Sequence, residues 1–382
     1  MDFDPLWLLV LPLVFGMGWL ASRLDLRQAK RDPRDASKPY FQGLNFLLNE
    51  QQDKAIDAFI EAVQHDPDTA ELHFALGNLF RRRGETERAV RVHQHLLQRG
   101  DLPALERARA QHALAQDFFK AGLFDRAEAA YRALRGTVFE PEADLALLSL
   151  YERSRDWAQA GPVAQALEER GMGSFAARRA HYLCEQALQA RSEGQTPQAL
   201  ALLQQARQIA PGHPRAQMLM GQWALAQGDS QAALGHFEAL LSTCPASFNL
   251  AAADYARAAQ QAQGSAPIER AGKLLEARYS QDHALALVLA LNQLQPDRQA
   301  ERLSQHLKLQ PGSLNAAKGL FSALDLAGAA SAAQIQPTLE RAAKPLMRHR
   351  CAACGFEAAH YFWQCPGCLS WDSFPPHPVE EL

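Results

Sequence analysis

Residues 76–90 read LGNLFRRRGETERAV, which sets single small residues into an otherwise helix-like pattern of apolar and polar positions. Gly77 lies in the apolar part, Gly84 follows seven residues later and Ala89 twelve residues later. A glycine such as Gly84 suits the left-handed conformation that ends a helix. The stretch therefore predicts two helices joined at Gly84, which touch where small residues allow close approach.

The same register recurs on both sides of this stretch, in units that start 34, 38, 33, 39 and 34 residues apart. The positions equivalent to Gly77 are Gly43, Gly77, Ala115, Leu148, Ala187 and Gly221. Twelve residues after each of them stand Ala55, Ala89, Ala127, Ala160, Ala199 and Ala233, and sixteen residues after each stand Phe59, His93, Tyr131, Ala164, Leu203 and Phe237. Nineteen residues after each stand Ala62, Leu96, Leu134, Leu167, Ala206 and Leu240. Small residues where paired helices touch and large apolar residues between them are typical of tetratricopeptide repeats. We expect an all-α fold, a tetratricopeptide-repeat superhelix or α-solenoid.

Glycine and proline mark the ends of the predicted helices. The first helix of a pair is expected to end at Gly84, Gly122, Gly194 and Gly228, which occupy equivalent positions in their repeats. The second helix is expected to end at Pro67, Pro211 and Pro245. After about residue 250 the pattern is degenerate, although residues 285–309 and 314–339 still look like helical pairs. The predicted array covers residues 37–345, with about nine helix pairs.

The inner groove of such a superhelix is lined by the first helix of each repeat. Counted by register, the side chains that we predict to form a partner-binding groove are Tyr40, Leu44, Phe74, Asn78, Arg81, Arg82, His112, Gln116 and Phe119. This mixture of aromatic, amide and basic groups suits an extended peptide or a helix from a partner protein. An ordinary solvated face is the alternative, and it accounts for Arg81 and Arg82 equally well.

The N-terminus carries an apolar run from Pro5 to Ala21. Seventeen residues of helix span roughly 25 Å, at the short end of membrane-crossing helices. The start is acidic and lacks a small-residue cleavage motif, which disfavours a signal peptide. We therefore predict a single-pass transmembrane anchor at residues 1–21, followed by a charged linker at residues 22–36. Because the linker is rich in arginine and lysine, we expect a periplasmic N-terminus and a cytoplasmic bulk of the chain.

Near the C-terminus two Cys-x-x-Cys knuckles are separated by ten residues. Their thiolates, from Cys351, Cys354, Cys365 and Cys368, can form a tetrahedral four-sulfur shell for one metal ion. Zinc is favoured and iron is the alternative. Gly355 follows the first knuckle, where a positive φ is often required. We expect Tyr361, Phe362, Trp363, Trp371 and Phe374 to wrap the metal as a miniature core, within a domain at residues 346–382.

Disulfides are disfavoured for these cysteines because the body of the chain reads as intracellular, and no thioredoxin-like pattern surrounds either knuckle. The formal net charge of −3 with no long basic block argues against a nucleic-acid partner. The chain has no phosphate-binding loop, no His-Glu-x-x-His and no nucleophile elbow. The sequence therefore predicts a protein that binds other proteins rather than an enzyme.

Specific stretches resemble the lipopolysaccharide assembly protein B family of Gram-negative bacteria. They are residues 43–48 with 51–55, residues 76–81, residues 121–128, and the metal end with Cys351-x-x-Cys354-Gly355-Phe356 and Trp363-x-Cys365-Pro366-x-Cys368-x-x-Trp371. The resemblance covers nearly the whole chain and implies a rubredoxin-like metal-binding end. One departure from rubredoxins proper is Leu369, where glycine is usual, and it favours a structural ion over iron redox chemistry.

The resemblance also implies a function, that of an adaptor at the inner membrane. In that family the protein helps the membrane-bound AAA protease FtsH degrade the deacetylase that commits precursor to lipid A. Further partners there are lipopolysaccharide transport proteins and a membrane regulator of lipopolysaccharide level. A rubredoxin-type electron carrier fused to an interaction scaffold is the alternative. A chaperone cofactor that grips C-terminal carboxylates would need a regular Lys/Asn clamp, which the sequence lacks.

Overall fold

The computed structural model describes residues 14–19, 33–66, 68–324 and 332–382. Most of the predicted anchor (residues 1–21) and of the predicted linker (residues 22–36) lies outside these residues. Within them, no helix combines the length and the apolar character that crossing a bilayer requires. The chain divides into two compact units, Met1–Leu150 and Tyr151–Leu382.

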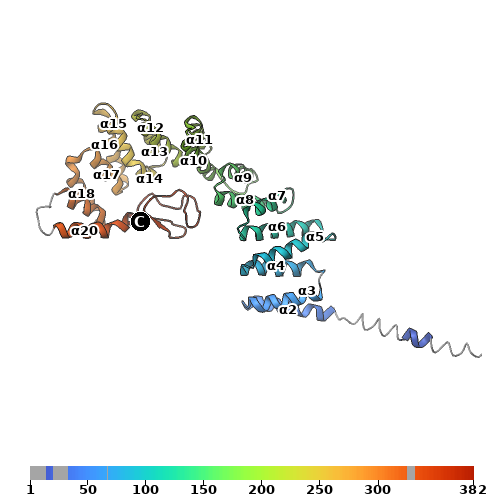
Figure 1. Cartoon of the computed structure of the whole chain (residues 1–382). Helices are drawn as coiled ribbons and strands as arrows, with labels where there is room; N and C mark the ends of the chain where they lie inside the picture. Colours follow the sequence, from blue (N-terminus) through green and yellow to red (C-terminus); the bar gives the residue numbers. More distant parts are fainter. Residues whose placement is uncertain (1–13, 20–32, 67, 325–331) are drawn as a thin grey trace, which may run out of the picture. The chain divides into compact units, whose positions relative to one another are not determined.

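The first unit is a series of helical hairpins in which each helix packs on the next along the chain (Figure 1). Its helices are α2 (Pro33–Leu48), α3 (Gln52–His65), α4 (Ala70–Arg83), α5 (Thr86–Gln98), α6 (Ala104–Lys120) and α7 (Phe124–Arg132), and α8 (Glu140–Ser154) runs across the boundary of the two units.

The second unit continues with the same hairpin arrangement and ends in a small region with two short strands. Its helices are α9 (Trp157–Glu169), α10 (Ala176–Ser192), α11 (Thr196–Ile209), α12 (Pro214–Ala226), α13 (Ser230–Thr243), α14 (Pro245–Phe248), α15 (Ala252–Gln261), α16 (Ala266–Gln281), α17 (Leu285–Leu294), α18 (Gln299–Leu309), α19 (Leu314–Ala323) and α20 (Ala332–Ala343). The strands are β1 (His349–Arg350) and β2 (Glu357–Ala358), which pair antiparallel.

The helices end at the glycine and proline residues predicted from the sequence. Gly84 and Gly228 adopt φ values of 81° and 82°, in the left-handed region, as do the two glycines at equivalent positions. Pro211 follows the end of α11 and Pro245 follows that of α13, whereas Pro67 lies outside the described residues. The sequence thus predicted the all-helical repeat fold correctly, including helical pairs in the degenerate part after residue 250.

Small residues in the first helix of a repeat make room for a large side chain of the second helix. A Cβ atom on Gly43 would lie 2.9 Å from the Phe59 ring, and one on Gly221 would lie 2.7 Å from the Phe237 ring. Ala55 and Ala233, the alanines of the second helices, are fully buried. The small and large residues that repeat in the sequence are therefore those at which the two helices of each repeat touch.

One of these contacts is polar and belongs to a buried ion cluster. His93 occupies the position held by phenylalanine or tyrosine in three other repeats, and its Nδ1 atom lies 2.5 Å from Asp117 of α6. Both side chains are completely buried. Arg81 of α4 donates to the same carboxylate at 2.9 Å and to Asn78 at 2.6 Å. The cluster ties α4, α5 and α6 together through the charge on Asp117.

At the other end of the chain two glutamates bond to the starts of helices far away in sequence. The Glu381 carboxylate accepts the backbone N–H of Leu285 at the start of α17, at 2.7 Å. The Glu380 carboxylate accepts the backbone N–H of Asn315 in α19 at 3.0 Å and the Ser313 hydroxyl at 3.1 Å. Backbone N–H groups in the first helical turn lack partners within the helix, so these carboxylates act as caps supplied from outside.

Replacing Gly77 by alanine should lower the free energy of unfolding by about 1–2 kcal/mol. A Cβ atom there would lie 2.5 Å from Nε2 of His93, and the bond to Asp117 limits how far that ring can move. The matched control is Gly100→Ala, because its Cβ would meet nothing within 4 Å. Urea denaturation followed by circular dichroism measures the difference. Equal stability of Gly77→Ala and the wild type would mean that the α4–α5 contact is loose.

Candidate metal centre

Two short loops bring the four cysteines to one point. β1 and β2 flank the first Cys-x-x-Cys, and an isolated bridge between Gln364 and Trp371 closes the second. In each knuckle the backbone turns through the left-handed region at the same place, at Gly355 with φ 78° and at Leu369 with φ 61°. The amides of these two residues donate to the carbonyls of Cys351 and Cys365 at 2.9 and 2.8 Å. The prediction of a positive φ at Gly355 is confirmed.

The sulfur positions fit one tetrahedral ion. Cys351 and Cys368 sulfurs lie 3.8 Å apart, Cys354 and Cys365 sulfurs lie 3.7 Å apart, and all four lie within 4.8 Å of one another. Zinc bound to sulfur at about 2.3 Å in a tetrahedron requires sulfur–sulfur distances of about 3.8 Å. Such a four-sulfur set suits zinc or iron. The four predicted ligands are therefore brought together, and a bound ion would hold the two knuckles closed.

Neighbouring groups stabilise the thiolate form of two of the four cysteines, Cys351 and Cys368, whereas the pKa values of Cys354 and Cys365 are raised. Burial raises the pKa of Cys351, but the Ser373 hydroxyl at 3.3 Å and nearby backbone N–H groups lower it to about 6. The Ser370 hydroxyl at 3.3 Å from Cys368 also lowers the pKa of that thiol. Cys351 and Cys365 are buried, whereas Cys354 and Cys368 are exposed. Each knuckle thus contributes one inner and one outer sulfur, already surrounded by hydrogen-bond donors.

Only part of the predicted aromatic core surrounds the cysteines. Phe374 and Tyr361 pack against buried Cys351 and Cys365, as expected. The Trp363 ring lies 5.0 Å from that of Tyr361, and the Phe362 ring, 37% exposed, lies 6.1 Å from that of Phe374. Trp371 instead stacks on His181 of α10, and Trp363 also faces His181 and His213. The expectation was wrong for Trp371, because the sequence could not indicate a partner in a distant repeat.

Trp371 is the main contact between the knuckle and the repeats. Its ring stacks on His181 of α10 with centroids 4.4 Å apart and planes inclined by 22°. Its Nε1 donates to the Glu152 carboxylate at 3.0 Å, and Glu152 also accepts the Tyr182 hydroxyl. Trp157 lies edge-on to the same indole at 5.8 Å. The metal-binding region is therefore docked on helices α8 to α10 of the second unit.

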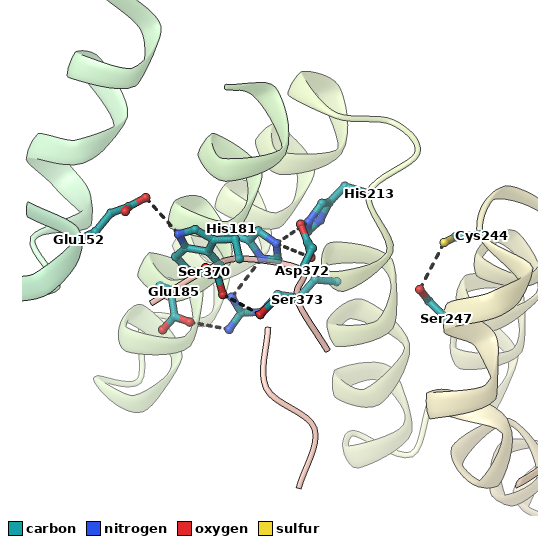
Figure 2. Close-up of polar contacts among 11 residues, drawn as sticks. Glu152, His181, Glu185, His213, Cys244, Ser247, Ser370, Asp372 and Ser373 are labelled. Atoms are coloured by element: carbon teal, nitrogen blue, oxygen red, sulfur yellow. Dashed lines mark hydrogen bonds and ion pairs between the residues drawn. The ribbon is translucent and has the colours of Figure 1, made fainter. Parts of the chain in front are cut away.

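A polar cluster beside this stack completes the docking site (Figure 2). His181 Nε2 lies 2.9 Å from Asp372 Oδ1 and 3.0 Å from His213 Nε2. Arg215 Nη1 lies 3.4 Å from His181 Nδ1, and Arg215 Nη2 donates to the Glu185 carboxylate at 2.6 Å. Both histidines are buried. His181 and His213 thus lie beside one aspartate of the knuckle, and Arg215 links His181 to Glu185.

His181, His213 and Asp372 are close enough together to hold a metal ion, but their neighbours favour a proton instead. Arg215 can only donate, so His181 Nδ1 must accept and Nε2 carries the hydrogen. A metal ion at Nε2 would need the opposite tautomer, with an N–H facing the guanidinium. We therefore assign an Nε2–H of His181 donating to Asp372.

The pKa shifts in this cluster agree with neutral histidines beside a charged aspartate. Burial lowers the pKa of His181, and burial together with the repulsion that a protonated His181 would exert lowers the pKa of His213 to about 3. Burial raises the pKa of Asp372, but the hydrogen bond from His181 holds it below its usual value. No sequence signal marked this site, because His181, His213 and Asp372 come from separate segments and each looks like an ordinary polar residue.

The predicted groove residues of the first unit differ in how far their side chains are exposed to solvent. Phe74 is 1% exposed and packs against Leu96, Leu102 and Ala110, so its assignment to a partner surface was wrong. At its position α4 faces the next repeat rather than the groove. Leu44 and Arg82 are exposed, whereas partly buried positions are held by Tyr40, Asn78, Arg81, His112, Gln116 and Phe119. Arg81 is also committed to Asp117.

Comparison with known proteins matches the same elements. A family model described as a rubredoxin metal binding domain matches residues 349–376, and tetratricopeptide repeat models match residues 72–108, 112–175 and 190–247. Lipopolysaccharide assembly protein B of Escherichia coli (strain K12) is 30% identical to this chain, over 96% of this chain and 97% of that protein. The chain belongs to the lipopolysaccharide assembly protein B family.

A second curated protein of this family is also similar to the chain. Lipopolysaccharide assembly protein B of Haemophilus influenzae is 29% identical, over 96% of this chain and 97% of that protein. Among solved structures, a tetratricopeptide repeat protein from Parabacteroides merdae is 15% identical and covers 68% of this chain and 99% of that chain, with a TM-score of 0.34. Membership in the lipopolysaccharide assembly protein B family confirms the resemblance, and the rubredoxin match confirms the predicted metal-binding end.

The two knuckle turns should respond oppositely to substitution. Leu369→Gly should tighten metal binding by about 1 kcal/mol, roughly fivefold, because glycine adopts a positive φ without strain. Gly355→Ala should weaken it by a similar amount, since a Cβ there meets nothing within 4 Å and only the backbone conformation is penalised. Competition with a chelator measures both. The same direction of change for both variants would contradict the assigned turns.

Docking of the knuckle should weaken as the pH falls below about 6.5. His181 and His213 have lowered pKa values in the docked state, so the released state binds protons that the docked state excludes. The lowered pKa of Asp372 acts in the same direction at more acidic pH. Hydrogen exchange of residues 361–374, with zinc in excess, measures docking at pH 7.5 and 5.5.

A local measurement is needed because His377, whose pKa is raised chiefly by its hydrogen bond to Glu381, stabilises its own contacts at low pH and loses that effect as the pH rises. His213→Asn should flatten the pH dependence of exchange in residues 361–374. His360→Asn, at an exposed position of the same region, is the matched control and should leave it unchanged. An unaltered slope in His213→Asn would contradict the assignment.

Proposed function

We propose that this protein is an inner-membrane-anchored cytoplasmic adaptor that regulates lipopolysaccharide biosynthesis. In this proposal it presents the lipid A-committing deacetylase to the FtsH protease and so coordinates lipopolysaccharide assembly. Lipopolysaccharide transport proteins and a membrane regulator are further proposed partners. Membership in the lipopolysaccharide assembly protein B family and the repeat architecture support this assignment.

The observation that carries the proposal is the docking of the metal knuckle on the repeats. Four sulfurs fill a tetrahedral shell and leave no coordination position for a substrate. The knuckle instead presents Trp371 and Asp372 to α10 and α12, through the stack on His181 and the hydrogen bond to it. A metal that organises these residues acts as a structural support for a binding scaffold.

The predicted anchor gives the adaptor its place of action. Tethering at residues 1–21 would confine the repeats to the surface of the inner membrane, which raises their effective concentration near a membrane-bound protease. The proposed orientation keeps the N-terminus periplasmic and the repeats in the cytoplasm with the deacetylase. In the first unit, Arg82 is a predicted groove residue whose exposed side chain is available to a client.

A rubredoxin-type electron carrier is the second candidate, and one observation favours it. Cys354 and Cys368 are exposed, which would allow an electron to pass between a bound iron and a redox partner at the surface. Metal analysis and the colour of the purified protein distinguish the two functions. Zinc and no visible absorption support the adaptor, and a red, redox-active protein supports the carrier.

Loss of either the metal or the docking contact should slow degradation of the deacetylase in a reconstituted membrane system with FtsH. Cys351→Ser should lose metal and turnover together. Trp371→Ala should keep the metal but lose turnover, because it removes the stack on His181 and the bond to Glu152. His360→Ala, exposed on the same knuckle, is the control with normal turnover.

Degradation followed by immunoblot and zinc measured by mass spectrometry report the two properties separately. Full turnover by metal-free Cys351→Ser would refute the structural role of the metal. Full turnover by Trp371→Ala would refute the role of docking.

A further inference from the structure

Helix α2, the first of the repeat array, exposes an apolar stripe. Phe41 is 63% exposed, Leu44 36% and Leu48 85%, and their spacing of three and four residues puts them on one side of the helix. The opposite side is used for packing, since Gly43 is buried against the Phe59 ring of α3. The helix therefore has two apolar sides, and the described residues cover only one of them.

This stripe is unusual within the helices of the repeat array. Among helices α3 to α20, exposed large apolar side chains occur at most singly on the accessible side of a helix, for example Leu105, Leu188 and Leu289. Single exposed residues of this kind are ordinary. A terminal repeat normally has a polar outer face, because it has no neighbour on that side. Three large apolar side chains on the first helix therefore indicate a surface that is covered when the protein works.

Charge indicates what covers the stripe. In the sequence, Arg34 and Lys38 stand seven and three residues before Phe41. Residues 22–38 carry six basic and three acidic side chains, whereas the whole chain has a net charge of −3. A helix with basic residues beside phenylalanine and leucine is typical of segments that lie in the interface of an anionic membrane.

We propose that the stripe formed by Phe41, Leu44 and Leu48 lies in the surface of an anionic bilayer, to which the basic sequence before it adds attraction. This proposal rests on the membrane anchor of the proposed function. The eleven residues between Ala21 and Pro33 can span at most about 40 Å, so an anchored chain keeps α2 within reach of the membrane. The first repeat is then a second, peripheral attachment that holds the start of the array against the lipid.

Side-chain footprinting by hydroxyl radicals tests this on the full-length protein, because it reads the solvent exposure of individual phenylalanine and leucine residues. The protein is reconstituted in vesicles of phosphatidylethanolamine with phosphatidylglycerol, in vesicles of phosphatidylcholine alone, and in detergent. Phe41, Leu44 and Leu48 should be protected severalfold in the anionic vesicles relative to the other two samples. Leu123, exposed on the first unit, is the internal control and should not change.

A double variant tests the membrane contact of the stripe independently of the comparison between vesicles and detergent. Phe41→Ser with Leu48→Ser should return Leu44 in anionic vesicles to the reactivity it has in detergent, and Leu123→Ser should leave that protection intact. Stripe residues that are equally reactive in all three samples would overturn the proposal. Equal protection in both kinds of vesicle would overturn its electrostatic part. Protection that grows with protein concentration in detergent would assign the stripe to a second copy of the chain.

The test separates this proposal from the anchor. A protein that floats with the vesicles while Phe41 and Leu48 stay reactive retains its anchor and refutes only the peripheral attachment. A protein that does not float with any vesicle refutes the anchor itself.

Discussion

The stack of Trp371 on His181 holds together two parts of the second unit that are 190 residues apart in sequence. A region of fewer than about 40 residues does not usually fold on apolar burial alone. Here a bound metal ion would fix the second knuckle, and the bridge between Gln364 and Trp371 spans the two cysteines of that knuckle. The position of the indole would then depend on the ion, and docking on the repeats would depend on the indole. Docking therefore requires the ion, whereas the four ligands of the ion all lie within the knuckle.

Two charge clusters restrict how the repeats can pack. Asp117 is completely buried between His93 and Arg81, whereas Asp372 is 46% exposed but bonds to the fully buried His181. Buried ion pairs contribute little net stability, because desolvation offsets most of the attraction. Leaving one partner unpaired is costly, however, so each cluster penalises a repeat packed against the wrong neighbour. In an array of similar units, such selectivity disfavours pairing of a repeat with the wrong neighbour.

The sequence predicted the features that local geometry determines. Cys-x-x-Cys spacing sets a metal shell, and the glycine at residue 84 ends a helix whatever surrounds it. The features that it did not predict arise between distant segments. Trp371 looked like a core residue of the knuckle until α10 supplied its partner, and nothing in the sequence connected Asp372 to two histidines in other repeats. Phe74 was misplaced for a related reason, since a helical register gives the direction of a side chain but not which neighbouring helix covers it.

The external caps of α17 and α19 have a consequence for how the chain folds during synthesis. Glu381 lies 96 residues after the backbone N–H that it accepts, and Glu380 lies 65 residues after its own. Both helices leave the ribosome well before the carboxylates that complete their first turns. The last repeats must therefore wait in an incomplete state, where chaperones and proteases can act on them, until the tail arrives to close them.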